Sequence, residues 1–112
     1  MLIDFRQPES NIDTLRREVA AFVLRASNVL EREAVKRNSR PASVRIGIMR
    51  ITADLYKLWG WTQGEQLSPL VNLSPAETPD ALRGIAADMY ALAARVYAAN
   101  AQQPNHELYA TG

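Results

Sequence analysis

The chain has 112 residues, with 13 Lys or Arg against 12 Asp or Glu, no cysteine and a formal net charge of +1. This length is sufficient for one domain with its own core, and the lack of cysteine excludes disulfides, thiol catalysis and cysteine-ligated metal sites. The longest uncharged apolar run near the N-terminus covers only residues 19–24, which is too short for a signal sequence or a membrane span. We therefore expect a cytoplasmic protein with no membrane contact.

The first predicted helix covers residues 11–38. Ser10 or Asn11 supplies its N-cap, and Asp13 places a negative charge in the first turn. Apolar residues then recur with the three- and four-residue spacing of one helix face, at Leu15, Val19, Phe22, Ala26, Val29 and Leu30. Pro41 cannot continue the helical hydrogen bonds, so the residues around it separate this helix from the next.

The second predicted helix begins at Ser43 as N-cap and ends at Gly60. One face repeats apolar residues, at Val44, Ile48, Ile51, Leu55 and Leu58. Residues 44–48 also alternate in the manner of a strand, because β-branched residues occupy every second position. The helical spacing persists for fifteen residues, however, and this favours a helix.

The third predicted helix covers residues 79–100 and follows a long ordered loop over 60–78. Gly64, Pro69 and Pro75 interrupt any regular element in that loop. Four apolar residues are expected to anchor it to the core, namely Leu67, Leu70, Val71 and Leu73. Thr78 then serves as cap and Pro79 as the first helical residue. We expect one helical domain over 1–100 and a flexible polar tail over 101–112.

Two of these helices have apolar or small residues on a second face. The helix over 43–60 carries Ile46, Met49, Ala53 and Tyr56 there and has a polar strip of Arg50, Asp54 and Lys57. The helix over 79–100 carries Ala87, Ala91, Ala94 and Ala98. A helix in a monomeric three-helix bundle buries only about half of its circumference. The second faces therefore need cover from another part of the chain or from another subunit.

The predicted fold is thus an all-α three-helix bundle that forms a homodimer or higher homo-oligomer. The predicted interface consists of Ala87, Ala91, Ala94, Ala98, Met49 and Tyr56. In the alternative arrangement, the long loop and the N-terminal segment with Leu2, Ile3 and Phe5 cover the second faces within one chain.

The positive charge is concentrated in one part of the chain. Residues 16–57 contain ten Lys or Arg against four Asp or Glu, which gives +6, whereas residues 1–15 sum to −2 and residues 58–112 to −3. A basic junction between the first two helices contains Arg32, Lys36, Arg37, Arg40 and Arg45. Such a cluster suits an acidic protein partner or the phosphates of a nucleic acid, although a solvated face whose Arg stems cover apolar surface is the favoured explanation. The second helix has few polar residues near its start, so base readout is not expected.

Three further residues stand out. Trp59 and Trp61 flank Gly60 and could stack on a base or a peptide, but indoles of this kind usually close a core. Trp59 lies on the apolar stripe and is predicted to be the buried anchor, whereas Trp61 lies beyond the expected helix end. Glu33 interrupts the stripe of the first helix and is expected to pair with Arg37, one turn later.

Catalytic and metal-binding motifs are lacking. His106 is the only histidine, and no metalloprotease, hydrolase, P-loop or dinucleotide-binding signature occurs. We therefore predict a non-enzymatic helical interaction protein without a cofactor that acts through protein–protein contacts. The alternative is a nucleic-acid-associated regulator that uses the basic junction, and a small-ligand binder or hydrolase ranks third.

Overall fold

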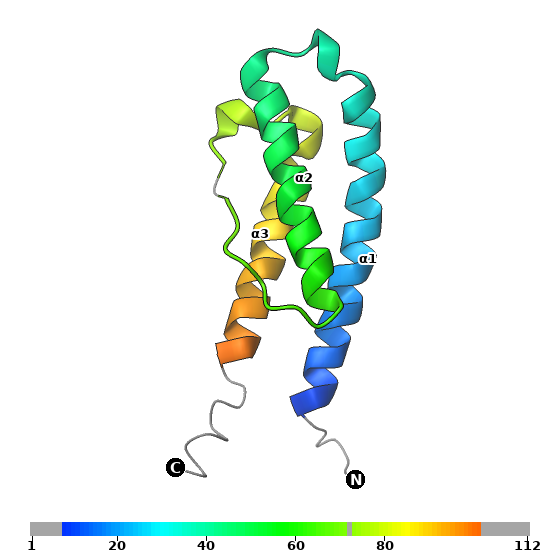
Figure 1. The fold of residues 1–112 in the computed structure, drawn as a ribbon, viewed down its shortest axis with the longest axis vertical. Helices are drawn as coiled ribbons and strands as arrows, with labels where there is room; N and C mark the ends of the chain where they lie inside the picture. The colour runs from blue at the N-terminus through cyan, green and yellow to red at the C-terminus, as the bar shows by residue number, and fades with distance from the viewer. Residues whose placement is uncertain (1–7, 72, 102–112) are drawn as a thin grey trace.

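The computed structural model describes residues 8–71 and 73–101, and within them the only regular secondary structure is helical (Figure 1). The elements in chain order are α1 (Pro8–Val35), the 3-10 helix η2 (Arg37–Ser39), α2 (Ala42–Thr62), the 3-10 helix η3 (Pro75–Glu77) and α3 (Asp80–Ala101). The all-α class and the three helices are therefore confirmed. The strand alternative for residues 44–48 is wrong, because these residues belong to α2.

The helices are arranged so that α2 and α3 run in the same direction and α1 runs antiparallel to both (Figure 1). Parallel neighbours cannot be joined by a tight turn, so residues 63–79, here called the return loop, lead the chain back along the bundle. A helix of 21 residues such as α2 is about 32 Å long. The ten residues 65–74 can span about 33 Å when extended. The return loop is therefore long because the topology requires that length.

The core lies where the three predicted apolar stripes meet. Its fully buried hydrophobic residues come from all three helices and are Val19, Ala26, Ile51, Leu58, Leu82, Met89 and Val96. Val29, Val44 and Ile85 are only partly buried and pack around this centre. The side chain of Arg95 links α3 to α1 through two bonds to the carboxylate of Glu18, at 2.7 and 3.0 Å. That contact lowers the pKa of Glu18 from its ordinary value.

The ends of the first and third helices differ from the expected positions. α1 begins at Pro8 and ends at Val35, because the backbone tightens into a turn at Lys36 and then into η2. α3 begins at Asp80, and the hydroxyl of Thr78 donates to the carbonyl of Ser74, so it closes η3 instead of capping α3. The expected cap at residues 10–11, the N-terminal segment and the tail over 102–112 lie outside the described side chains.

The α2 helix begins and ends differently from the expectation. Pro41 occupies the N-cap position, so Ser43 is not the cap. The helix continues through Gly60 to Thr62, and the residue that ends it is Gly64, the one described glycine with a positive φ, of 101°. The amide of Gly64 donates to the carbonyl of Trp61, and the amide of Glu65 donates to that of Gly60. This pair of bonds is the Schellman motif of a helix C-terminus, in which glycine tolerates the left-handed conformation.

The later end of α2 reverses the roles predicted for the two tryptophans. Trp61 continues the buried stripe three residues after Leu58 and is only 2% exposed. The guanidinium of Arg16 lies over its ring, 5.2 Å from the centroid. Trp59 is 38% exposed. The prediction that Trp59 is the buried anchor is therefore wrong, because Gly60 does not end the helix.

The return loop is fastened to α2 and α3 at several points. Of its expected anchors, Leu67 is buried, Leu70 and Leu73 pack against the core, and Val71 is half-buried. The ammonium of Lys57 donates to the carbonyl of Pro69 at 2.9 Å, and the hydroxyl of Tyr97 donates to that of Ser68 at 3.0 Å. These bonds tie the loop to both parallel helices.

Candidate interaction groove

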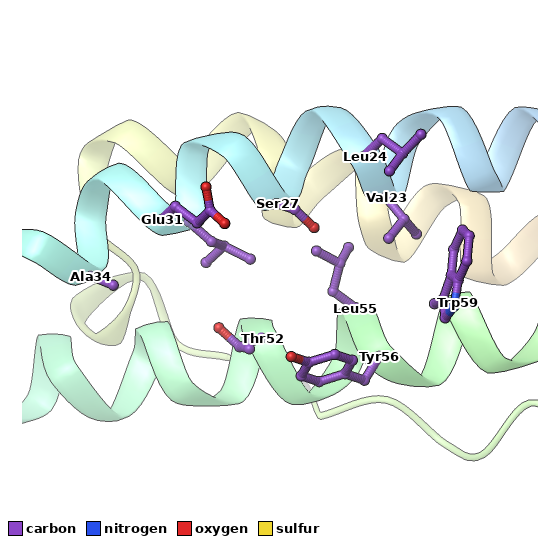
Figure 2. Close-up of a pocket in the computed structure, with 10 residues that line it drawn as sticks. Val23, Leu24, Ser27, Glu31, Ala34, Thr52, Leu55, Tyr56 and Trp59 are labelled. Carbon is purple, nitrogen blue, oxygen red and sulfur yellow. The ribbon is translucent and has the colours of Figure 1, made fainter.

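A groove of about 380 Å³ runs between α1 and α2 on a side to which α3 contributes no residue. Figure 2 shows its two walls, with Leu24 and Glu31 on α1 and Thr52, Tyr56 and Trp59 on α2. The complete lining, here called the α1–α2 groove, is Val23, Leu24, Ser27, Leu30, Glu31, Ala34, Thr52, Leu55, Tyr56 and Trp59. Its floor is continuous with the core, because Val23, Leu30 and Leu55 are buried.

Three large side chains on this groove remain in contact with solvent. Leu24 is 62% exposed, Tyr56 is 71% exposed and Trp59 is 38% exposed. Met49 lies two turns before Tyr56 on α2 and is also exposed. A single exposed apolar side chain is common on protein surfaces, but a contiguous group along a groove is typical of a binding surface.

The polar groups of the groove suit the binding of a partner better than catalysis. The hydroxyl of Thr52 donates to the carbonyl of Ile48 at 2.8 Å and is therefore already engaged. Glu31 supplies the one carboxylate of the lining, which contains no imidazole, amine or thiol. General acid–base or nucleophilic catalysis needs at least a second group within hydrogen-bond reach. The groove instead offers apolar area with one charge at its edge.

The two parts of the predicted interface lie on different surfaces. Met49 and Tyr56 are exposed on the α2 side. The alanine face of α3, defined as Ala87, Ala91, Ala94 and Ala98, is exposed as well. Because all four alanines are exposed, a close helix–helix contact on this face does not form within one chain. Its use between copies stays a prediction.

The basic junction is partly neutralised within the chain. The guanidinium of Arg40 contacts the Glu33 carboxylate at 2.6 Å, and Lys36 lies 3.8 Å from the same group. Arg45 donates to the carbonyl of Arg40 at 2.8 Å. Arg32 is exposed, and the side chain of Arg37 lies outside the described residues. The structure therefore brings Lys36 and Arg40 together around one acid, and contact with a nucleic acid or an acidic partner stays a prediction.

Glu33 occupies the buried position that the stripe of α1 predicted, with an exposed fraction of only 3%. Its described partners are Arg40 and Lys36, whereas the side chain of Arg37, the expected partner, lies outside the described residues. Because α1 ends at Val35, the chain turns and brings Arg40 back over the carboxylate. Glu33 is therefore a structural ion-pair residue at the end of the bundle.

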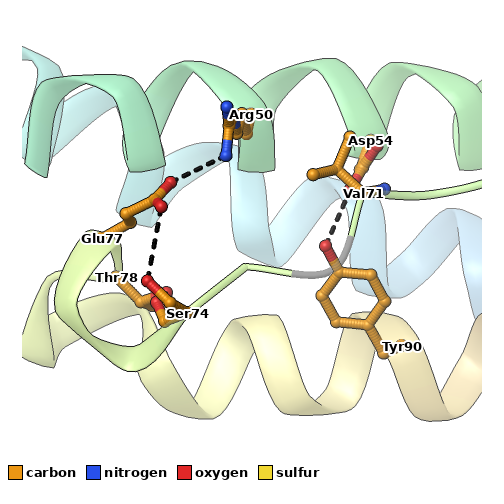
Figure 3. A network of polar contacts seen from close by, with 7 residues as sticks. All are labelled: Arg50, Asp54, Val71, Ser74, Glu77, Thr78 and Tyr90. Carbon is orange, nitrogen blue, oxygen red and sulfur yellow. Dashed lines mark hydrogen bonds and ion pairs between the residues drawn. The ribbon is translucent and has the colours of Figure 1, made fainter. Parts of the chain in front are cut away.

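Asp54 was expected on the polar strip of α2 but is fully buried. One carboxylate oxygen accepts hydrogen bonds from the amide of Val71 and the hydroxyl of Tyr90, both at 2.9 Å (Figure 3). The other oxygen lies 3.5 Å from the ammonium of Lys57. Burial, followed by the bond to Asp54, raises the pKa of Tyr90. The cluster joins α2, the return loop and α3, and its burial leaves no access for a ligand.

A second contact between the return loop and α2 lies close to this cluster. Arg50 donates to the carboxylate of Glu77 at 2.8 Å, and Ser74 donates to the other oxygen of that group (Figure 3). Here η3 approaches α2 closely, since a Cβ atom added to Gly47 would collide with the carbonyl oxygen of Glu77. Gly47 is required for this approach.

Of the residues that line the groove, the sequence predicted Tyr56 as a contact residue but not Leu24, Ser27 or Thr52. A signal for Leu24 was present, because 100° per residue places it roughly opposite the core stripe of α1. A large apolar residue among the polar positions of an amphipathic helix indicates a second contact surface. Ser27 and Thr52 carry no comparable signal.

The described helices are not long and apolar enough to cross a membrane. Within residues 8–71 and 73–101, no group of three or more potential metal-ligating side chains occurs. Comparison of the chain with family models, with curated proteins and with solved structures finds no match.

Proposed function

We propose that this protein is a non-enzymatic interaction module whose α1–α2 groove receives a helix of a protein partner. The observation that carries the proposal is the convergence of Leu24, Tyr56 and Trp59 on one solvent-filled groove. Burial of such side chains stabilises a complex by about 25 cal/mol for each Å² of apolar area removed from water. Aromatic residues at the centre of a patch are typical binding hot spots.

A helix is the ligand best suited to this groove. Two antiparallel helices form its walls, and a third helix can pack along the seam by placing its side chains between theirs. The groove also lacks the enclosed, polar character of a small-molecule site, since its lining supplies mainly aliphatic and aromatic carbon.

Photo-crosslinking from inside the groove tests this function. A benzoyl-phenylalanine at position 56 in the full chain should form covalent adducts with a protein in the producing cells. The same residue at position 83, an exposed site on α3, should form none. Leu24→Lys should abolish the adducts of position 56, because it places a charge at the centre of the apolar contact.

The test compares the adducts formed from two probe positions, so capture of a protein from one position is not by itself support. Equal adducts from positions 56 and 83, or adducts from position 56 that survive Leu24→Lys, would contradict the proposal. Complete lack of adducts at position 56 would contradict it as well. Circular dichroism of each variant controls for folding, and exposed substitutions of this kind change stability only slightly.

A further inference from the structure

Three evenly spaced residues of α1 place a cation and an anion on opposite sides of a leucine. Arg17, Leu24 and Glu31 are spaced by seven residues, so they lie along one face of the helix with a drift of only about 20° per step. All three are exposed. Neither charged residue forms an ion pair with any of the described side chains.

We infer that the helix received by the α1–α2 groove is α1 of a second copy of this chain, packed antiparallel across Leu24. A two-fold axis at Leu24 places Arg17 of each copy beside Glu31 of the other, because both lie about 10.5 Å from Leu24 along the helix. One contact surface then pairs with itself and gives a closed dimer. This inference rests on the proposed function of the groove.

The surroundings of Leu24 suit such a crossing. Its neighbours three and four positions away on α1 are small or short, namely Ala20, Ala21, Ser27 and Asn28. Because these side chains are short, Leu24 stands above its neighbours, and the leucine of a facing helix can pack beside it. Tyr56 and Trp59 border the same site from α2 and supply apolar area beside it.

Charge decides the direction of the partner helix. A parallel arrangement in the same register would place Arg17 against Arg17 and Glu31 against Glu31, and like charges at a contact oppose binding. The antiparallel arrangement forms two opposite-charge pairs instead. Arg16, which precedes Arg17, is held over Trp61 of its own chain, so it does not compete with Arg17 for the Glu31 carboxylate of the other copy.

Charge reversal tests the inference directly, with mass measured by light scattering or sedimentation over a range of concentrations. The parent chain should associate to twice its mass of 12.5 kDa. Arg17→Glu alone and Glu31→Arg alone should each weaken the dimer by about 10-fold or more, because two attractive contacts become repulsive. The double variant Arg17→Glu with Glu31→Arg should return to within about 3-fold of the parent.

The matched control is Arg83→Glu, the same substitution on α3, which should leave the dimer unchanged. A fully monomeric parent, or a double variant no stronger than the single variants, would overturn the inference. If either result is obtained but position 56 forms adducts with a different protein, the proposed function of the groove still stands. If position 56 forms no adducts, the proposed function and the dimer inference both fail. Leu24→Gln adds a charge-neutral check, since it should also disrupt the dimer.

Discussion

At the scale of single residues, the tryptophan pair gives a direct test of where α2 ends. Trp61→Ala should lower the free energy of unfolding by about 3–5 kcal/mol, because it removes a large buried side chain. That is a large share of the roughly 5–15 kcal/mol that stabilises a typical domain. Trp59→Ala should cost clearly less. Urea unfolding followed by circular dichroism measures both, and the reverse order would mean that α2 ends at Gly60.

Tyr90 provides a second test, through its bond to the buried carboxylate of Asp54. Tyr90→Phe should lower the free energy of unfolding by about 1–2 kcal/mol at neutral pH, because a hydrogen bond to a charged group is lost. The fold raises the pKa of Tyr90 from its ordinary value of 10.0. The stabilisation is therefore complete below pH 10.0 and declines as the pH rises above it, because the unfolded chain then loses this proton first.

The measurement for Tyr90 is the difference in unfolding free energy between the parent and Tyr90→Phe at several pH values. Other titrating groups contribute equally to both proteins and cancel. The difference should be constant from pH 7 to about 9 and should shrink above pH 10. A difference that grows with pH would show that the hydroxyl does not donate to Asp54.

At the scale of elements, the contact between η3 and α2 depends on Gly47. Gly47→Ala should be destabilising by about 1–3 kcal/mol, because the new methyl group meets the backbone of Glu77 and must displace η3. Gly84 in α3 is the matched control, since a Cβ there meets nothing within 4 Å. Gly84→Ala should be stabilising by about 0.5–1 kcal/mol through helix propensity. Thermal unfolding compares the two, and a shift in the same direction would argue against the close contact.

Also at this scale, the helices could be predicted from the sequence, but several of their ends could not. The apolar periodicity around Val19, Ile51 and Met89 identifies each helix because core packing imposes that spacing. The end of α2 was misplaced because Gly60 and Gly64 look alike in sequence, and only the Schellman hydrogen bonds decide between them. Asp54 was misassigned for a related reason, since its partners Val71 and Tyr90 are distant in the chain.

At the scale of the whole molecule, the two exposed surfaces imply different assemblies. A groove that pairs with itself gives a closed dimer, whereas a groove that binds the alanine face of α3 on the next copy gives a ring or an open chain. Ala91→Glu separates these cases, because Ala91 belongs to the alanine face and does not line the α1–α2 groove. We expect light scattering to show the same mass as for the parent. A loss of association would instead place the interface on α3, as the sequence predicted.

The parallel course of α2 and α3 also determines the order in which the molecule folds. Six residues, 36–41, join α1 to α2, whereas the return loop of 17 residues must close before α3 can dock. The longer closure costs about 0.9 kcal/mol more in chain entropy. The antiparallel pair of α1 and α2 should thus form first, and α3 should be the last element to join it.

Leu82→Ala on α3 should then accelerate unfolding with little effect on the folding rate, whereas Ile51→Ala on α2 should slow folding. Stopped-flow measurements give both rates, and equal slowing by the two substitutions would mean that α3 is already docked in the transition state. A chain emerging from the ribosome would accordingly form α1 and α2 before α3 can pack on them. During that interval their core-facing apolar surface is exposed to solvent, and the protein is then most prone to aggregation.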